Sequence, residues 1–129
     1  MLNVSSDVNM STQAFKKSIA WQKAYKLVLE IYKSTEEFPI KERYGLTSQI
    51  RRAASSIVFN IAEGLLRNTL KELAHFFIIS RGSCGELETQ LMLAKDLSYM
   101  TGEISGALVE QTTEITRILN ASIKTLQTK

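Results

Sequence analysis

Apolar side chains recur every three or four residues along most of the chain, which is the spacing of one face of an α-helix. The first such segment runs from about Phe15 to Thr35. Its predicted inward stripe consists of Trp21, Ala24, Tyr25, Val28, Ile31 and Tyr32. Phe38-Pro39 ends the segment, because the residue before a proline is pushed out of helical geometry. The pattern therefore predicts a first helix followed by a loop that ends at Gly45.

The second segment, residues 46–64, reads LTSQIRRAASSIVFNIAEG. Thr47 can cap its start, and Gly64 lies where a left-handed cap would close it. The predicted apolar face consists of Ile50, Ala54, Ile57 and Ile61. On a wheel of ~100° per residue, Asn60 falls at the border of this face, where a simple surface helix would not need an amide. The segment therefore predicts a helix with polar groups at the edge of its buried side.

Two further amphipathic segments follow. Thr69 and Glu72 have the spacing of a capping box that begins a third helix, which we expect to extend to Tyr99. Thr101 can cap a fourth helix that runs to near the C-terminus. The predicted core positions are Leu73, Phe76, Phe77, Ser80, Cys84, Leu87, Leu91 and Ala94 in the third helix, and Ile104, Leu108, Ile115, Ile118, Leu119 and Leu126 in the fourth. Short connections between four amphipathic helices predict an all-α, antiparallel up-down-up-down four-helix bundle.

Four large apolar residues fall away from these predicted core faces. They are Phe59, Ile79, Leu93 and Leu97. A small monomer seldom exposes so many large apolar groups to water. We therefore expect them to form a subunit interface in a closed homo-oligomeric ring.

Composition narrows the class of protein. A chain of 129 residues with 44% hydrophobic residues and one proline fits a single helical domain, here residues 14–129. Residues 1–13 are polar, without a period and without the pattern of a signal peptide, and predict a disordered tail. With a single cysteine and no apolar run of ~18 residues, the chain is expected to be cytoplasmic and soluble.

Positive charge is concentrated in the first half of the chain. Residues 1–67 hold ten Lys and Arg against six Asp and Glu, a balance of +4, whereas residues 68–129 hold six against seven, a balance of −1. The candidates for contact with nucleic acid are Lys16, Lys23, Lys26, Lys33, Arg51, Arg52 and Arg67. A lone lysine-rich helix face is usually just solvated, but a ring of subunits would repeat it as a continuous basic surface.

Two short motifs invite an enzymatic interpretation that the rest of the sequence does not support. Glu72 and His75 match the Glu-x-x-His of di-metal bundles, which need two such motifs, and the chain has one histidine. Gly82-Ser83-Cys84-Gly85 lacks the spacing and setting of a nucleophile elbow. Small residues within a helix more often permit close packing. We therefore expect no catalytic residue, no metal and no cofactor.

The second and third segments together resemble one known family. Its hallmark reads roughly LTxQIRRAAxSIPxNIAEG, followed one helix later by RGSxxELET, and the chain matches both around Arg51, Arg52 and Arg81. Trp21-Gln22-Lys23-Ala24 and Phe38-Pro39 match the family's opening helix and first loop. One departure is Val58, where the family usually has a proline that would kink the helix. Over roughly Phe15 to Leu126, the chain resembles the four-helix-bundle proteins encoded in intervening sequences of 23S ribosomal RNA genes.

The resemblance implies a small ring-forming bundle, often a pentamer, that binds RNA, another nucleic acid or a protein that binds one, and it implies no enzyme activity. The polar residues that match the motif are Ser56, Asn60, Glu63, Arg81 and Glu86. They form either an RNA or ligand pocket or a hydrogen-bonded network between helices two and three, and we favour the network. The alternative function is a protein-interaction scaffold, because similar bundles accompany the reverse transcriptases of diversity-generating retroelements.

Overall fold

Helices make up most of the computed structural model, which describes residues 14–128. The four long helices are α2 (Ile19–Ser34), α3 (Leu46–Leu65), α4 (Leu70–Asp96) and α5 (Gly102–Gln127). Two short 3₁₀ helices accompany them, η1 (Ala14–Lys17) before α2 and η2 (Ile40–Glu42) before α3. The predicted tail, residues 1–13, lies outside the described residues. Within the described range, none of the helices has both the length and the apolar character needed to cross a membrane.

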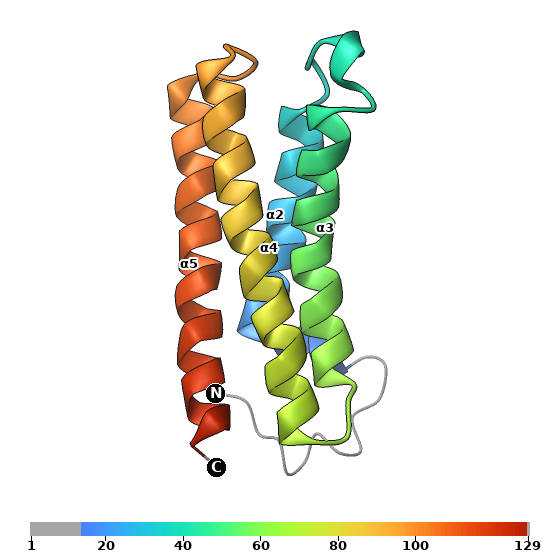
Figure 1. The fold of residues 1–129 in the computed structure, drawn as a ribbon, viewed down its shortest axis with the longest axis vertical. Helices are drawn as coiled ribbons and strands as arrows, with labels where there is room; N and C mark the ends of the chain where they lie inside the picture. Colours follow the sequence, from blue (N-terminus) through green and yellow to red (C-terminus); the bar gives the residue numbers. More distant parts are fainter. Residues whose placement is uncertain (1–13, 129) are drawn as a thin grey trace.

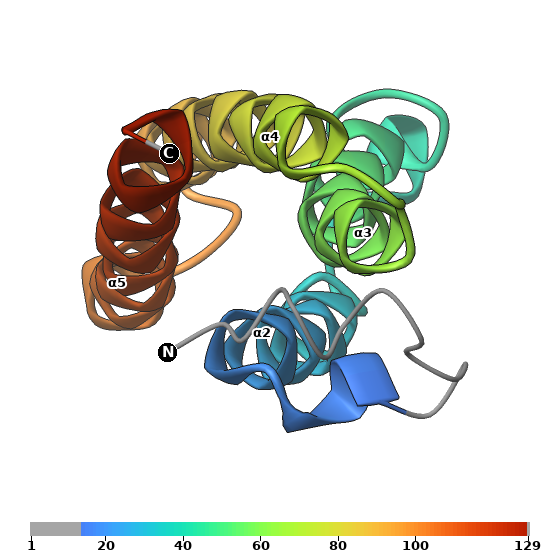
Figure 2. The ribbon, with the colours of Figure 1, turned by 90° about the horizontal axis from the view of Figure 1, so that it is seen from below.

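The long helices lie side by side and alternate in direction, because each short connection reverses the chain (Figure 1). Seen from one end, they follow one another in the order α2, α3, α4, α5 (Figure 2). The packing agrees with this order, since each helix contacts the next and α2 also contacts α5. The most extensive contact joins α3 and α4. These contacts confirm the predicted all-α four-helix bundle.

The core lies between the four helices and is almost entirely aliphatic. Its largest fully buried apolar side chains are Leu27, Ile31, Ile50, Ile57, Ile61, Phe77, Leu87, Leu91, Ile115 and Leu119. Each such side chain stabilises the fold by roughly 1.5–3 kcal/mol relative to exposure. The predicted apolar face of α3 is confirmed, and so are most predicted positions of α4 and α5. Ile104 is an error: it is exposed, and Ser105 is buried in its place, donating a hydrogen bond to the Leu91 carbonyl over 3.0 Å.

The first helix differs from its prediction in start and in orientation. It begins at Ile19, because the hydroxyl of Ser18 accepts a hydrogen bond from the Trp21 amide and caps it. Its buried side consists of Ala20, Ala24, Leu27 and Ile31. Tyr25 and Tyr32, predicted to be buried, are 49% and 45% exposed. A tyrosine has an apolar ring and a polar hydroxyl, so it favours the edge of a core, and small aliphatic residues fill the space between α3 and α5 instead.

Both predicted ends of α3 need correction. Thr47 does not cap the helix; Gly45 is the N-cap residue, and the Glu42 carboxylate accepts a hydrogen bond of 3.0 Å from the Leu46 amide. Gly64 is not a left-handed cap but a buried residue within the last turn. A Cβ atom there would lie 3.1 Å from the Cβ of Phe76 and 3.2 Å from a backbone oxygen of α4. Gly64 is therefore needed for the close approach of two helices.

The caps of α4 and α5 match the sequence more closely. Thr69 caps α4 as predicted, because its hydroxyl accepts a hydrogen bond from the Glu72 amide. The Glu72 carboxylate accepts from the Thr69 hydroxyl and not from the Thr69 amide, so the reciprocal bond of a capping box is replaced by one between the side chains. Thr101 caps α5 as expected. The far end of α4 comes three residues before the predicted Tyr99, because Ser98 adopts a φ of 65°. The amides of Ser98 and Tyr99 then bond back to the last turn, as in a Schellman motif.

Candidate functional site

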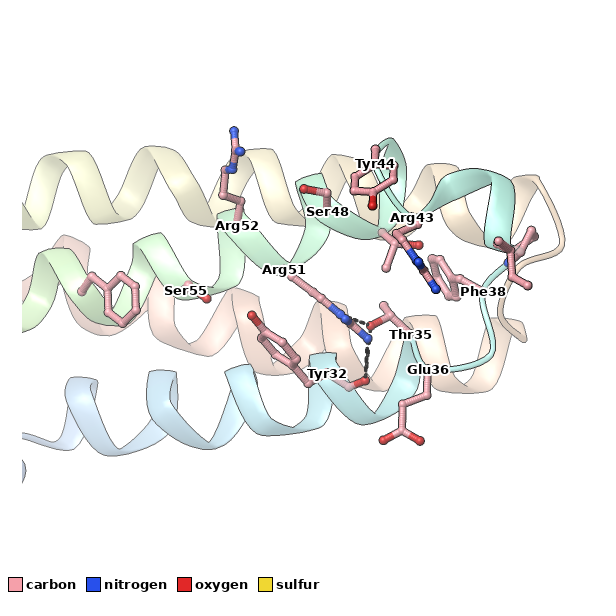
Figure 3. A pocket seen from close by; sticks show the side chains of 14 residues that line it. Tyr32, Thr35, Glu36, Phe38, Arg43, Tyr44, Ser48, Arg51, Arg52 and Ser55 are labelled. Carbon is pink, nitrogen blue, oxygen red and sulfur yellow. Dashed lines mark hydrogen bonds between the residues drawn. The ribbon is translucent and has the colours of Figure 1, made fainter.

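An open groove lies beside the end of α2 and the first half of α3 (Figure 3). Its volume is about 670 Å³, and its walls come from the last turn of α2, the loop that contains η2, and α3 as far as Phe59. The aromatic and cationic side chains that line it are Tyr32, Phe38, Arg43, Tyr44, Arg51, Arg52 and Phe59. Glu36 is the one acidic residue in the lining, so the three arginines give the groove a net charge of +2.

Arg51 is fixed on the side of the groove next to α2. Its Nε donates a hydrogen bond of 2.9 Å to the hydroxyl of Thr35, and its Nη2 donates one of 3.4 Å to the carbonyl of Tyr32. Its guanidinium also lies 4.6 Å from the centre of the Tyr32 ring. The neighbouring Arg52 is exposed and points away from Tyr32 (Figure 3). Arg51 therefore joins α3 to α2, whereas Arg52 keeps its donors available to solvent.

The loop above the groove is attached to the bundle at two points. The ring of Phe38 is buried and packs 5.6 Å from the ring of Tyr99, between centroids. The Tyr99 hydroxyl donates a hydrogen bond of 2.8 Å to Glu42, whose other oxygen accepts from Leu46. These two bonds hold the pKa of Glu42 below its ordinary value, and the bond to Glu42 raises the pKa of Tyr99. The loop is thus held at Phe38 and Glu42, while Tyr44 is 90% exposed.

The structure distributes the predicted basic residues over three places. Arg51 and Arg52 line the groove, and Lys16, Lys26 and Lys33 are exposed on η1 and α2. The remaining two are paired with carboxylates. Lys23 lies 3.1 Å from Glu114 of α5, and Arg67, beyond the far end of α3, lies 2.9 Å from Glu63 and 3.9 Å from Glu72.

Three exposed aromatic or cationic residues of the groove, Tyr32, Arg43 and Tyr44, are not among the binding residues predicted from the sequence. Arg43 and Tyr44 lie in the loop, where helical periodicity gives no information about direction. Their signal in the sequence is an arginine and a tyrosine directly before Gly45, in the loop between two predicted helices. Tyr32 was assigned to the core because its ring counts as apolar on a helical wheel.

The predicted polar network between α3 and α4 is only partly present. The hydroxyls of Ser56 and Ser83 lie 2.8 Å apart and join the two helices. Asn60 donates to the carbonyl and the hydroxyl of Ser56, over 2.8 and 3.0 Å. Glu63 and Glu86 are exposed and take no part in this group. Arg81 does not either, because its guanidinium donates to Asn120 of α5 over 3.0 Å. The prediction missed Ser83, which carries the link.

The structure shows where the residues of the two enzyme-like motifs, Glu72 to His75 and Gly82 to Gly85, lie. Ser83 and Cys84 are buried, and burial raises the pKa of the Cys84 thiol to about 11. A thiol with such a pKa is a weak nucleophile near neutral pH. Glu72 serves the α4 cap, and His75 is exposed. Over residues 14–128, no three His, Cys, Asp or Glu side chains are grouped as metal ligands would be.

The four apolar residues expected at a subunit interface are all exposed, in two separate areas. Phe59 lies at the end of the groove on α3. Ile79 and Leu93 lie on α4, and Leu97 directly follows it. Met92 on α4 is also exposed. Phe59 and the residues on α4 thus offer apolar surface on two helices, which contacts between copies would cover.

Comparisons with known proteins agree with this architecture. The model of the family described as 23S rRNA-intervening sequence protein matches residues 16–121. Among solved structures, the chain is similar to a protein of unknown function from the S23 ribosomal protein family of Bacteroides thetaiotaomicron, with a TM-score of 0.75 and 24% identity. That similarity covers 82% of this chain and 99% of the other, and at this identity it supports the fold alone. No curated protein matches the chain.

Proposed function

Since the chain belongs to the 23S rRNA-intervening sequence protein family, we propose that it is a non-enzymatic protein that binds structured RNA through the basic surface of α2 and α3. The observation that carries this proposal is the groove with three arginines and one glutamate. Guanidinium groups bind phosphate oxygens with two parallel hydrogen bonds, so an open groove that presents several of them suits a polyanion.

The lysines of α2 extend this surface beyond the groove. Lys26 and Lys33 are exposed and two helical turns apart, so they lie on the same side of α2. Lys33 directly follows Tyr32, which lines the groove. The described residues form only three ion pairs, and none of these involves a groove arginine, Lys26 or Lys33. Arg43, Arg52, Lys26 and Lys33 therefore remain available to phosphate groups, whereas Arg51 already donates to Thr35 and Tyr32.

A salt titration of RNA binding tests this proposal. Fluorescence anisotropy of a labelled hairpin RNA should give a log affinity that falls linearly with log salt, by about 0.7–0.9 per phosphate contacted. The double variant Lys26→Gln/Lys33→Gln should bind every RNA more weakly and have a shallower slope. Lys23→Gln is the matched control, because Lys23 is already paired with Glu114. Absence of binding at micromolar protein and about 50 mM salt would reject the proposal.

We further propose that the protein acts as a homo-oligomer, a pentameric ring by family resemblance. The exposed apolar residues Phe59 on α3 and Ile79 and Leu93 on α4 support contacts between copies, and a ring would multiply the basic surface of each copy. Native mass spectrometry at micromolar concentration should give one dominant species larger than a dimer. A clean monomer would reject the ring.

The second candidate is a protein-interaction scaffold, for example an accessory subunit of a retroelement reverse transcriptase. The exposed apolar side chains of Ile79, Met92 and Leu93 on α4 favour it, because they offer a partner protein a surface distinct from the groove. A purified protein that carries nucleic acid, seen as a raised 260/280 nm absorbance ratio, would favour RNA binding. A reverse transcriptase gene beside its own gene would favour the scaffold.

A further inference from the structure

The groove also contains exposed aromatic rings, which phosphate binding alone does not require. Tyr44 is 90% exposed, and Phe59 is 68% exposed. Tyr32 is different, because one face of its ring is already covered by the guanidinium of Arg51. Tyr44 is therefore the ring with the most free surface, and it is adjacent in the chain to Arg43, an exposed groove arginine.

Rings beside guanidinium groups are the combination that recognises unpaired nucleotides. A base that has left its stack can pack against an aromatic face, while arginine binds the phosphate next to it. A base inside a duplex cannot do so, because both of its faces are already stacked. The groove volume of about 670 Å³ lies within the ~300–1,000 Å³ of small-molecule sites, which suits one or two nucleotides.

The attachment of the loop makes this arrangement ready for binding. Glu42 is bonded to both Tyr99 and the start of α3, so the segment that carries Arg43 and Tyr44 is held in place from either side. Arg51 is likewise fixed by Thr35 and by Tyr32. Groups that are already positioned lose little conformational entropy when a ligand binds.

We propose that the groove binds an unpaired nucleotide of the RNA, with its base stacked on Tyr44 and its phosphate held by Arg43 and Arg52. This inference rests on the proposed function and assigns the single-stranded part of the RNA to the groove. The lysines of α2 contact the adjoining backbone without regard to pairing. The protein should then prefer hairpin loops over uniform duplexes of the same charge.

The test compares two labelled RNAs with equal numbers of phosphates, a hairpin with an adenosine-rich loop and a blunt duplex. Tyr44→Ala should weaken hairpin binding by about 10-fold, within the range of one base–aromatic stack, and should change duplex binding less than about 2-fold. Tyr44→Phe keeps the ring and should bind the hairpin as the parent does. Tyr25→Ala removes an exposed tyrosine outside the groove and should have no effect. Because Tyr44 is 90% exposed, both Tyr44 variants should fold as the parent does. Tyr25 stacks on Trp21 at 4.9 Å between ring centroids, so circular dichroism must show that the Tyr25→Ala control is folded at the temperature of the assay.

The outcomes separate this inference from the proposed function. If hairpin and duplex bind equally well and Tyr44→Ala changes neither, the groove inference is wrong while RNA binding stands. If neither RNA binds, both are wrong. Displacement of the hairpin by poly-glutamate as efficiently as by single-stranded RNA of equal charge would also overturn the inference, because the groove would then read charge alone. A 2-aminopurine in the loop should lose fluorescence on binding the parent and Tyr44→Phe proteins but not Tyr44→Ala.

Discussion

The two sides of α3 use polar residues in opposite ways. Toward α4, polar groups are small and paired: Ser56 meets Ser83 at 2.8 Å, and Ser80 donates to the Ile57 carbonyl at 2.8 Å. Gly64 lets the helices approach closely on this side. On the side of the groove, the groups are large and cationic: Arg51 bonds to α2, and the exposed Arg52 retains donors for a ligand. The α4 side serves packing, whereas the groove side also presents groups for binding.

The connections explain why the two sides differ. α3 and α4 are separated only by residues 66–69, so their adjoining ends must pack together. α2 and α3 are separated by residues 35–45, which include η2 and stand over the groove. The longer connection positions exposed side chains that a tight turn could not carry. Four predictions test how far this division holds.

The largest effect is expected where α3 and α4 are closest. Gly64→Val would force side-chain atoms against Phe76 and the backbone of α4, and such overpacking destabilises a protein by about 1–3 kcal/mol. At roughly 3–6 °C per kcal/mol, the melting temperature should fall clearly. Gly82→Ala is the control, because a Cβ there meets nothing within 4 Å. It should raise the melting temperature slightly, since alanine is the better helix former. Equal melting of both variants would show that the close contact is not needed.

Arg51 and Arg52 are neighbours on α3, and we expect the first to stabilise the fold and the second to bind RNA. Arg51→Ala removes the bonds to Thr35 and Tyr32 and should destabilise the protein by about 1–2 kcal/mol. Arg52→Ala should leave unfolding by urea unchanged and weaken RNA binding several-fold. This assignment of roles is wrong if Arg52→Ala unfolds more easily than the parent or if Arg51→Ala is as stable as the parent.

On the α4 side, Ser56→Ala should destabilise the protein by about 1 kcal/mol, because it leaves the buried hydroxyl of Ser83 without its partner. Glu63→Gln should have a smaller effect, since Glu63 forms an exposed ion pair with Arg67. Neither variant should change the affinity for RNA at a temperature where both are folded. A binding defect in Ser56→Ala would place part of the site on the α4 side.

The smallest effect concerns pH and the loop above the groove. The pKa of Glu42 is lowered in the fold, so its contribution to stability is present above the ordinary pKa of 4.5 and is lost as the pH falls through the lowered value. The pKa of Tyr99 is raised, so its contribution is present below the ordinary pKa of 10.0 and is lost at higher pH. Melting temperatures across pH should therefore decline at both extremes, and Glu42→Gln should reduce both declines. Identical profiles would show that the pair does not stabilise the loop.

The sequence predicts a feature well when the interactions that determine it join residues that are close together in the chain. The bundle and the apolar face of α3 follow from helical spacing, because aliphatic side chains such as those of Ile50 and Ile57 are more stable when they are removed from water. The caps at Thr69 and Thr101 are equally local, since each hydroxyl bonds an amide three residues ahead. Errors arise where the partner is distant. Gly64 is explained only by the approach of α4, which no spacing within α3 reveals.

The site shows the same limit more strongly. A helical wheel places Asn60 at the edge of the apolar face of α3, but a wheel does not say which neighbouring helix a polar side chain meets, and Arg81 of α4 donates to α5. The wheel also treats Tyr32 as apolar, although its hydroxyl favours the rim. Arg43 and Tyr44 belong to a loop whose position depends on the contact between Phe38 and Tyr99. The excess of positive charge in the first half of the chain was therefore predictable from the sequence. The residues that line the groove could be identified only from the structure.

The central claim is that RNA binds on the α2–α3 side of the bundle. Photo-crosslinking of a 4-thiouridine-substituted hairpin RNA, with mass spectrometry of the crosslinked peptides, tests this claim whether the protein is a monomer or an oligomer. We predict crosslinks within residues 26–59, with the highest yield at residues 40–52 and a loss of that signal in Tyr44→Ala. Crosslinks confined to α4 and α5 would contradict the account, because they would place the RNA on the side that the structure assigns to packing.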